Sequence, residues 1–152
     1  MSEATFESNG ACLCGKVTYK ATLKTAAGAC HCGMCRQWSG GPFMAVHATG
    51  DVTFNNDQHI SRFSASPWAE RGFCNQCGAN LFYYLLPRPG SPDGAYMMSA
   101  GTVSNQSQLY FDNEVFIDHA PGWYQFADDG ARKRLTEAAI MAMYSGQDKN
   151  AT

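Results

Sequence analysis

The sequence predicts a mainly β fold of small sheets with one C-terminal helix, organised around metal-binding cysteines. Three observations favour it: short extended segments alternate with glycine and proline turns, seven cysteines fall into tight groups, and a helical period occurs only near the C-terminus. The 152 residues fit a single domain, 1-152, long enough to bury a core.

The extended segments follow one another along most of the chain. Val17, Tyr19, Ala21 and Leu23 alternate with polar residues, which is the period of a half-buried strand. This strand leaves the first cysteine turn. Further strands are predicted over 42–48, 52–54, 59–64 and 81–86, and extended chain over 96–102 and 115–118; the segment 71–74 leads into the second cysteine turn.

The C-terminal segment is predicted to be helical. Leu135, Ala139, Ala142 and Met143 share one helical face, and Gly146 is expected to end the helix. We expect this face to pack against a sheet.

Composition and charge exclude several classes of protein. With 45% hydrophobic and 16% charged residues the chain is globular rather than disordered. The net charge of -2 and one short basic cluster at 132–134 argue against nucleic-acid binding. No apolar stretch reaches the roughly 18 residues of a membrane-spanning helix. Without a secretory signal, a cytoplasmic protein with reduced cysteines is expected.

The cysteines have the spacing of metal ligands. They form the groups Cys12-Leu-Cys14, Cys30-His-Cys32-Gly-Met-Cys35 and Cys74-Asn-Gln-Cys77. Cysteines two or three residues apart bend the backbone so that two sulfurs face one ion, and zinc prefers four such ligands. Seven sulfurs divide naturally into a closed set of four and an open set of three.

The spacing does not decide which four cysteines share an ion. The triplet Cys30, Cys32 and Cys35 already forms a three-ligand cup, and the two remaining pairs would then combine across about sixty residues. Two other interpretations stay open: a redox role for the Cys-x-x-Cys pairs, and one structural site with three free thiols. His31 is expected to point outward between its neighbouring ligands, and no histidine is given a chemical role.

Four segments together resemble the glutathione-dependent formaldehyde-activating enzyme family, which is related to centromere protein V. They are CLCGKVTY at 12–19, CHCGMCRQWSG at 30–40, RGFCNQCG at 71–78 and FIDHAPGWY at 116–124. The resemblance spans most of the chain.

The resemblance implies a β-tent fold with two Zn²⁺ ions per chain. One zinc would be structural, held by Cys12, Cys14, Cys74 and Cys77. The other would be held by Cys30, Cys32 and Cys35 with an open position, which makes these three the candidate catalytic residues. The implied activity is that of a carbon-sulfur lyase, joining glutathione and formaldehyde into S-hydroxymethylglutathione.

A thiol substrate also suits the residues themselves. Three thiolates weaken zinc as a Lewis acid toward water but let it hold a fourth, soft thiolate. Glutathione has two carboxylates, so we expect a cation near the open site: Arg36 first, then Arg62 and Arg71. Trp38 is expected to form a wall of the pocket.

Other roles for these cysteines remain open. The triplet could instead release its metal and exchange with glutathione as a mixed disulfide. A non-catalytic zinc scaffold that binds thiols or a protein, and a metal or redox buffer, are further alternatives.

Overall fold

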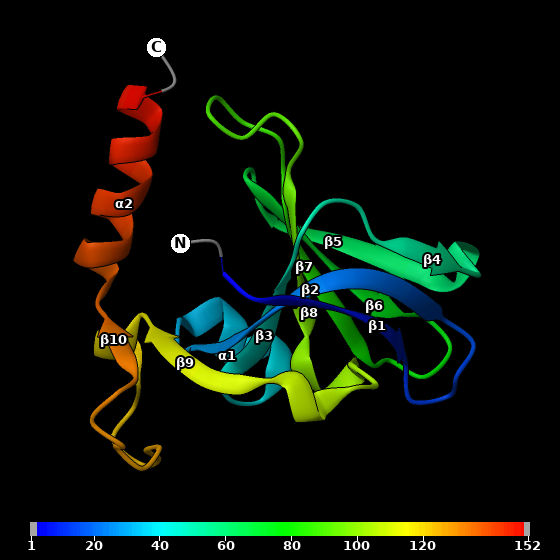
Figure 1. Cartoon of the computed structure of the whole chain (residues 1–152), viewed down its shortest axis with the longest axis horizontal. Helices are drawn as coiled ribbons and strands as arrows, with labels where there is room; N and C mark the ends of the chain where they lie inside the picture. Colours follow the sequence, from blue (N-terminus) through cyan, green and yellow to red (C-terminus); the bar gives the residue numbers. More distant parts are fainter. Residues whose placement is uncertain (1–2, 151–152) are drawn as a thin grey trace.

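The computed structural model describes residues 3–150, and it describes the side chains of residues 3–144. Within them ten strands belong to one hydrogen-bonded sheet, and two α-helices lie outside it. The strands are β1 (Thr5–Ala11), β2 (Thr18–Cys30), β3 (Phe43–Ala48), β4 (Thr53–Asn55), β5 (Ile60–Ser66), β6 (Ala69–Cys74), β7 (Asn80–Leu85), β8 (Ala95–Ser99), β9 (Tyr110–Val115) and β10 (Lys133–Leu135), and the helices are α1 (Gly33–Ser39) and α2 (Glu137–Asn150). The mainly β class and the C-terminal helix are confirmed, and the strands form one curved sheet rather than several small ones (Figure 1).

The longest strand, β2, organises the sheet. It pairs antiparallel with β1, β3 and β4 and parallel with β9, so strands from distant parts of the chain meet on it (Figure 1). Val17, Tyr19, Ala21 and Leu23 are all buried, as their alternation predicts. Because β2 begins just after the first cysteine turn and ends at Cys30, it joins two of the cysteine groups.

The sheet continues from β3 through β8, β7 and β6 to β5, each strand antiparallel to the next. Its core side chains include Leu23, Val46, Phe82 and Met98, which have no exposed surface. Burial of these large apolar side chains is the main driving force for folding this sheet.

Two segments predicted to be extended have different limits in the structure. The segment 96–102 leaves the extended conformation after Ser99, because the hydroxyl of Thr102 donates to the Ser99 carbonyl at 2.7 Å and closes a 3-10 turn. Of the segment 115–118 only Val115 is extended, as the last residue of β9, and Ile117–His119 form a 3-10 turn. Phe116 has a left-handed backbone with φ of 54°, which ends the strand.

The C-terminal helix was predicted with the wrong packing and the wrong end. Leu135 lies in β10 rather than on the helix, and α2 stands beside the sheet instead of packing on it (Figure 1). Met141 and Met143 are 48% and 56% exposed. The helix continues through Gly146 to Asn150, since glycine inside a helix costs only about 1 kcal/mol. No helix in the described part of the chain is both long and apolar enough to cross a membrane.

Candidate metal centres

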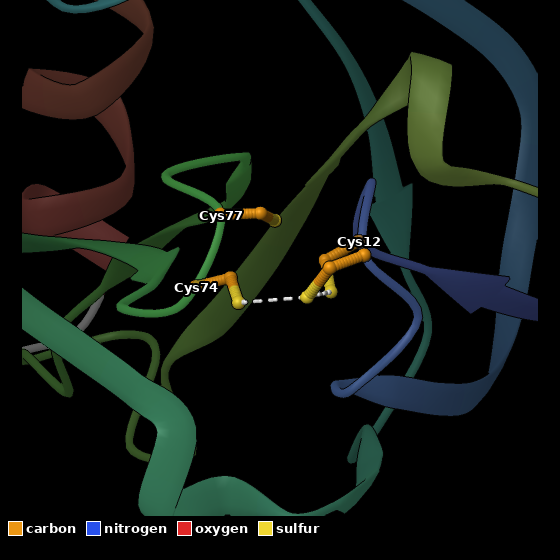
Figure 2. Close-up of side chains that lie close together, drawn as sticks. Cys12, Cys74 and Cys77 are labelled. Atoms are coloured by element: carbon orange, nitrogen blue, oxygen red, sulfur yellow. Dashed lines mark hydrogen bonds between the residues drawn. The ribbon is translucent and has the colours of Figure 1, made fainter.

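Four sulfurs from two distant turns converge on one point. The Sγ atoms of Cys12, Cys14, Cys74 and Cys77 lie within 4.8 Å of one another. The distance from Cys12 to Cys14 is 3.6 Å and that from Cys14 to Cys74 is 3.9 Å. Figure 2 shows Cys74 and Cys77 on one turn facing Cys12 on the other. The structure therefore brings together the two cysteine pairs that remain once the triplet is set apart in the sequence.

Both turns are built so that sulfur can face an ion. Gly15 and Gly78 close them with φ of 79° and 78°, a left-handed conformation that glycine adopts without a Cβ clash. In the first turn the backbone N–H of Val17 donates to Cys12 Sγ at 3.3 Å. In the second, the backbone N–H of Ala79 is the main cause that lowers the pKa of the Cys77 thiol to about 6. Backbone donors thus favour thiolate in this cluster.

The geometry of this cluster fits a zinc ion. A Zn–S bond of about 2.3 Å gives a tetrahedron whose sulfur–sulfur edges are about 3.8 Å long. The two short distances, 3.6 and 3.9 Å, match that edge. They are far longer than a disulfide bond of about 2.0 Å, and all seven cysteines are free thiols. Four ligands of this kind form a closed site.

The second cluster holds three sulfurs. Cys30 is the last residue of β2, Cys32 is the N-cap of α1, and Cys35 lies on that helix; their Sγ atoms are within 4.8 Å of one another. Cys35 is buried, whereas Cys30 and Cys32 are half-buried. Three sulfurs leave one position of a zinc tetrahedron unfilled by this cluster.

The short helix α1 was not predicted. Its N-cap is a cysteine rather than the usual serine or aspartate: Cys32 Sγ accepts the backbone N–H of Cys35 at 3.4 Å. Gly40, with φ of 79°, ends the helix. Sulfur contacts from Cys30 and Cys35 lower the pKa of Cys32 to about 2, and the same kind of contact raises the pKa of Cys30.

A buried arginine contacts this cluster. Arg71 on β6 is 5% exposed, and its Nη1 donates to Cys35 Sγ at 3.6 Å. Its guanidinium carbon lies 5.1 Å from the ring centroids of both Trp38 and Tyr83. The expectation that Arg71 binds a carboxylate of glutathione is therefore wrong, since the group is enclosed by aromatic rings.

His31 points inward, which corrects the prediction that it faces outward. It is 1% exposed, and its two ring nitrogens lie 2.8 Å from Glu114 Oε1 and 2.8 Å from the Tyr124 hydroxyl. Glu114 also accepts from Arg132 Nε at 2.9 Å and lies 3.5 Å from Arg134 Nε. This buried network, His31–Tyr124–Glu114–Arg132, ties the second cluster to β9 and to the segment after it.

A comparison of the sequence with protein-family models decides the family. The model described as glutathione-dependent formaldehyde-activating enzyme matches residues 7–119, which include all seven cysteines. The chain belongs to the glutathione-dependent formaldehyde-activating enzyme family. It is also 32% identical over 123 residues to an uncharacterized lyase from Schizosaccharomyces pombe (strain 972 / ATCC 24843), a match that covers 80% of this chain and 87% of that relative.

Arg36 lies beside the triplet in this family member, and it is the first residue predicted to bind glutathione. Arg36 is half-buried, and its Nε donates to the carbonyl of His31 at 2.9 Å. The predicted pocket wall, Trp38, packs against Phe43 with ring centroids 5.1 Å apart and also covers Arg71. Arg62 lies elsewhere, over the ring of Phe82 at 4.9 Å. Binding of glutathione by Arg36 and Trp38 stays a prediction.

A cleft of about 620 Å³ lies between the closed cluster and the end of α1. Its walls include Cys12, Ser39, Phe43 and Asn80, and none of the residues that line it is charged. This cleft offers an anionic substrate no cation. Arg36, the cation predicted for a carboxylate of glutathione, is not among the residues that line this cleft.

A third group of possible ligands lies at the start of α2. Asp118, His119 and Glu137 have ligand atoms within 4.8 Å of one another. They already satisfy each other, since His119 Nε2 is 3.0 Å from Glu137 Oε2 and Asp118 Oδ1 accepts the backbone N–H of Glu137 at 3.0 Å. This arrangement fixes the first turn of the helix, which accounts for the group without a metal ion.

Proposed function

We propose that this protein is a zinc-dependent carbon-sulfur lyase-type enzyme that acts on glutathione adducts, such as S-hydroxymethylglutathione formed from glutathione and formaldehyde. Membership of the family and similarity to a lyase support the reaction class. The observation that carries the proposal is the contrast between the two clusters: four convergent sulfurs in one and three, partly exposed, in the other.

The two clusters have different roles in this proposal. Cys12, Cys14, Cys74 and Cys77 hold a structural zinc that fastens the first turn to the end of β6. Cys30, Cys32 and Cys35 would hold a second zinc, which would supply a position for the thiolate of a substrate. The half-burial of Cys30 and Cys32 leaves this side open to a substrate, while Cys35 and Arg71 form its buried base.

The neighbouring residues orient the substrate. Arg36, anchored through Nε to the His31 carbonyl, presents a cation beside the triplet for a carboxylate of glutathione. Trp38 forms an apolar wall. The sulfur of glutathione then attacks the carbon of formaldehyde, a C–S bond forms, and the carbonyl oxygen takes up one proton; the reverse reaction breaks that bond. Positioning of both partners provides the acceleration, and a separate protein nucleophile is not needed.

Metal content and exchange kinetics test this proposal together. We expect about two zinc ions per chain, and we expect Cys32→Ser to lose about one while the fold is retained. Exchange between glutathione, formaldehyde and their adduct, followed by NMR, should be faster with the protein than without it and should return to the uncatalysed rate in Cys32→Ser. Met34→Ala is the matched control, because Met34 is 39% exposed beside the cluster and is not a ligand.

Two results would contradict the proposal. If Cys32→Ser unfolds the protein, the triplet is structural. If the wild-type protein binds two zinc ions but leaves the exchange rate unchanged, the protein is a non-catalytic zinc-binding scaffold. The uncharged cleft next to Cys12 favours this second function, because it suits an apolar or neutral partner rather than glutathione.

A further inference from the structure

Arg71 carries a charge that is buried against a sulfur atom of the triplet. Its side chain makes one described hydrogen bond, to Cys35 Sγ at 3.6 Å, and lies between the rings of Trp38 and Tyr83. None of the ion pairs found among the side chains of residues 3–144 includes Arg71. By contrast, the buried guanidinium of Arg132 forms an ion pair with the carboxylate of Glu114.

A guanidinium stays protonated in proteins, so burial of Arg71 requires compensation. Two aromatic faces supply part of it through cation–π attraction. The remainder must come from a negative charge in contact with the group, because an unpaired buried charge is strongly destabilising. The sulfur of Cys35, which belongs to the triplet, is the group in that position.

We propose that Arg71 is the built-in counter-cation of the three-cysteine cluster, and that it sets both the affinity of the cluster for a divalent metal ion and its tolerance of an anionic fourth ligand. The charges support this: three thiolates around a divalent ion carry a formal charge of about -1, which one arginine neutralises. A substrate thiolate then meets a neutral site instead of an anionic one. This inference rests on the proposed function only for the identity of the fourth ligand.

Arg71 is a positioning residue in this scheme, because its burial keeps it from touching substrate. Arg62 provides a matched comparison within the same chain. It also stacks on two rings, those of Phe82 at 4.9 Å and Tyr84 at 5.8 Å, but it is exposed and its hydrogen bond goes to the Tyr96 hydroxyl rather than to sulfur.

The test compares Arg71→Met, Arg71→Lys and Arg62→Met in the full chain. Zinc affinity is measured by competition with a chelator, and Co²⁺ is used as a spectroscopic probe of the thiolate ligands. Loss of a contact just outside the metal ligands typically lowers metal affinity by about 10- to 100-fold. In Arg71→Met we expect such a loss at one of the two ions and a shift of its sulfur-to-cobalt absorption band. Arg71→Lys should restore most of the metal affinity and most of the absorption band. Arg62→Met should change neither of these two quantities.

Three results would overturn the inference. One is wild-type affinity for both ions in Arg71→Met. Another is an Arg71→Lys protein as weak as Arg71→Met, since packing rather than charge would then be responsible. If Arg71→Met does not fold, Arg71→Lys alone decides: loss of the second ion despite a retained positive charge contradicts the inference. Metal affinity is independent of turnover, so a wild-type protein that is inactive but binds two ions refutes the proposed function alone.

Discussion

The imidazole of His31 and the carboxylate of Glu114 are in direct contact, 2.8 Å apart, although 83 residues separate them in the chain. A ring nitrogen that faces a carboxylate carries the hydrogen, so Nε2 donates to Glu114, while Nδ1 pairs with the Tyr124 hydroxyl. Because His31 lies between Cys30 and Cys32, the contact fixes the turn that carries the triplet against β9.

Replacing the carboxylate should therefore destabilise the protein strongly. In Glu114→Gln the buried guanidinium of Arg132 loses its nearest and only buried counter-charge among the described pairs, keeping the exposed Asp129 at 3.8 Å, and breaking a buried pair costs about 3–5 kcal/mol. We expect a loss of that size in the free energy of unfolding by urea, with zinc present in excess. Glu7→Gln, at an exposed position of β1, should stay within about 0.5 kcal/mol of wild type. Equal stabilities of the two variants would show that the pair is not important for folding.

The same carboxylate predicts a dependence of stability on pH. Burial raises the pKa of Glu114, but hydrogen bonds from Arg132 and His31 outweigh burial and lower it below the ordinary value of 4.5. A lowered pKa in the folded state stabilises the protein above the unfolded pKa, and this contribution is lost as the pH falls through the folded value. The difference in unfolding free energy between wild type and Glu114→Gln should be constant near neutrality and shrink below about pH 4.5. A difference that grows on acidification would contradict this assignment.

Removing only the phenolic hydroxyl should have a smaller effect. Tyr124→Phe leaves Nδ1 of the buried His31 without this hydrogen-bond partner, and the net value of such a hydrogen bond is about 1 kcal/mol. Thermal unfolding measures the loss. Tyr110→Phe, at a position that is 56% exposed, controls for loss of a hydroxyl and should leave the melting temperature unchanged.

Two glycine substitutions separate close packing from chain flexibility. A Cβ at Gly72 would overlap the ring of Phe82, which has no exposed surface and no room to move. Overpacking of this kind costs about 1–3 kcal/mol. At Gly101 a Cβ meets no atom within 4 Å, so Gly101→Ala should be close to neutral. Denaturant unfolding of both variants tests the comparison, which fails if Gly72→Ala is as stable as Gly101→Ala.

The closed cluster should be required for folding. Zinc binding to structural cysteine sites is worth about 10–16 kcal/mol at pH 7, which is at least as large as the net stability of most domains. We expect Cys74→Ser to lose the regular β signal in circular dichroism, whereas Cys32→Ser keeps it. A folded Cys74→Ser protein with one zinc ion would reverse the roles assigned to the two clusters.

Local patterns predicted the parts of the fold that local chemistry determines. The alternation through Tyr19 and Leu23 found β2, and the cysteine spacing separated the triplet from the two pairs. Strand β1 was missed because two of its buried positions hold Ser8 and Gly10, which interrupt an apolar alternation. Position 10 needs a glycine because of a tertiary contact: a Cβ there would overlap the ring of Tyr19.

The rest of the site depends on contacts between distant segments. Nothing near His31 in the sequence indicates its partners, because Glu114 and Tyr124 come from β9 and the chain beyond it. Arg71 likewise reads as a surface charge until β6 is placed against α1. The helix α1 is 7 residues long, too short for a helical period, and it depends on a sulfur cap that propensity rules do not include.

Strand β6 carries residues of both clusters: Arg71 touches Cys35, and Cys74, the last residue of the strand, belongs to the closed set. Three residues of extended chain span only about 10 Å. Stripping the closed set of its ion would release the strand end that holds the arginine in place, whereas emptying the triplet leaves that end fastened. In the proposed two-zinc form, loss of the triplet's ion would therefore leave the fold intact, whereas loss of the closed set's ion would also loosen the triplet.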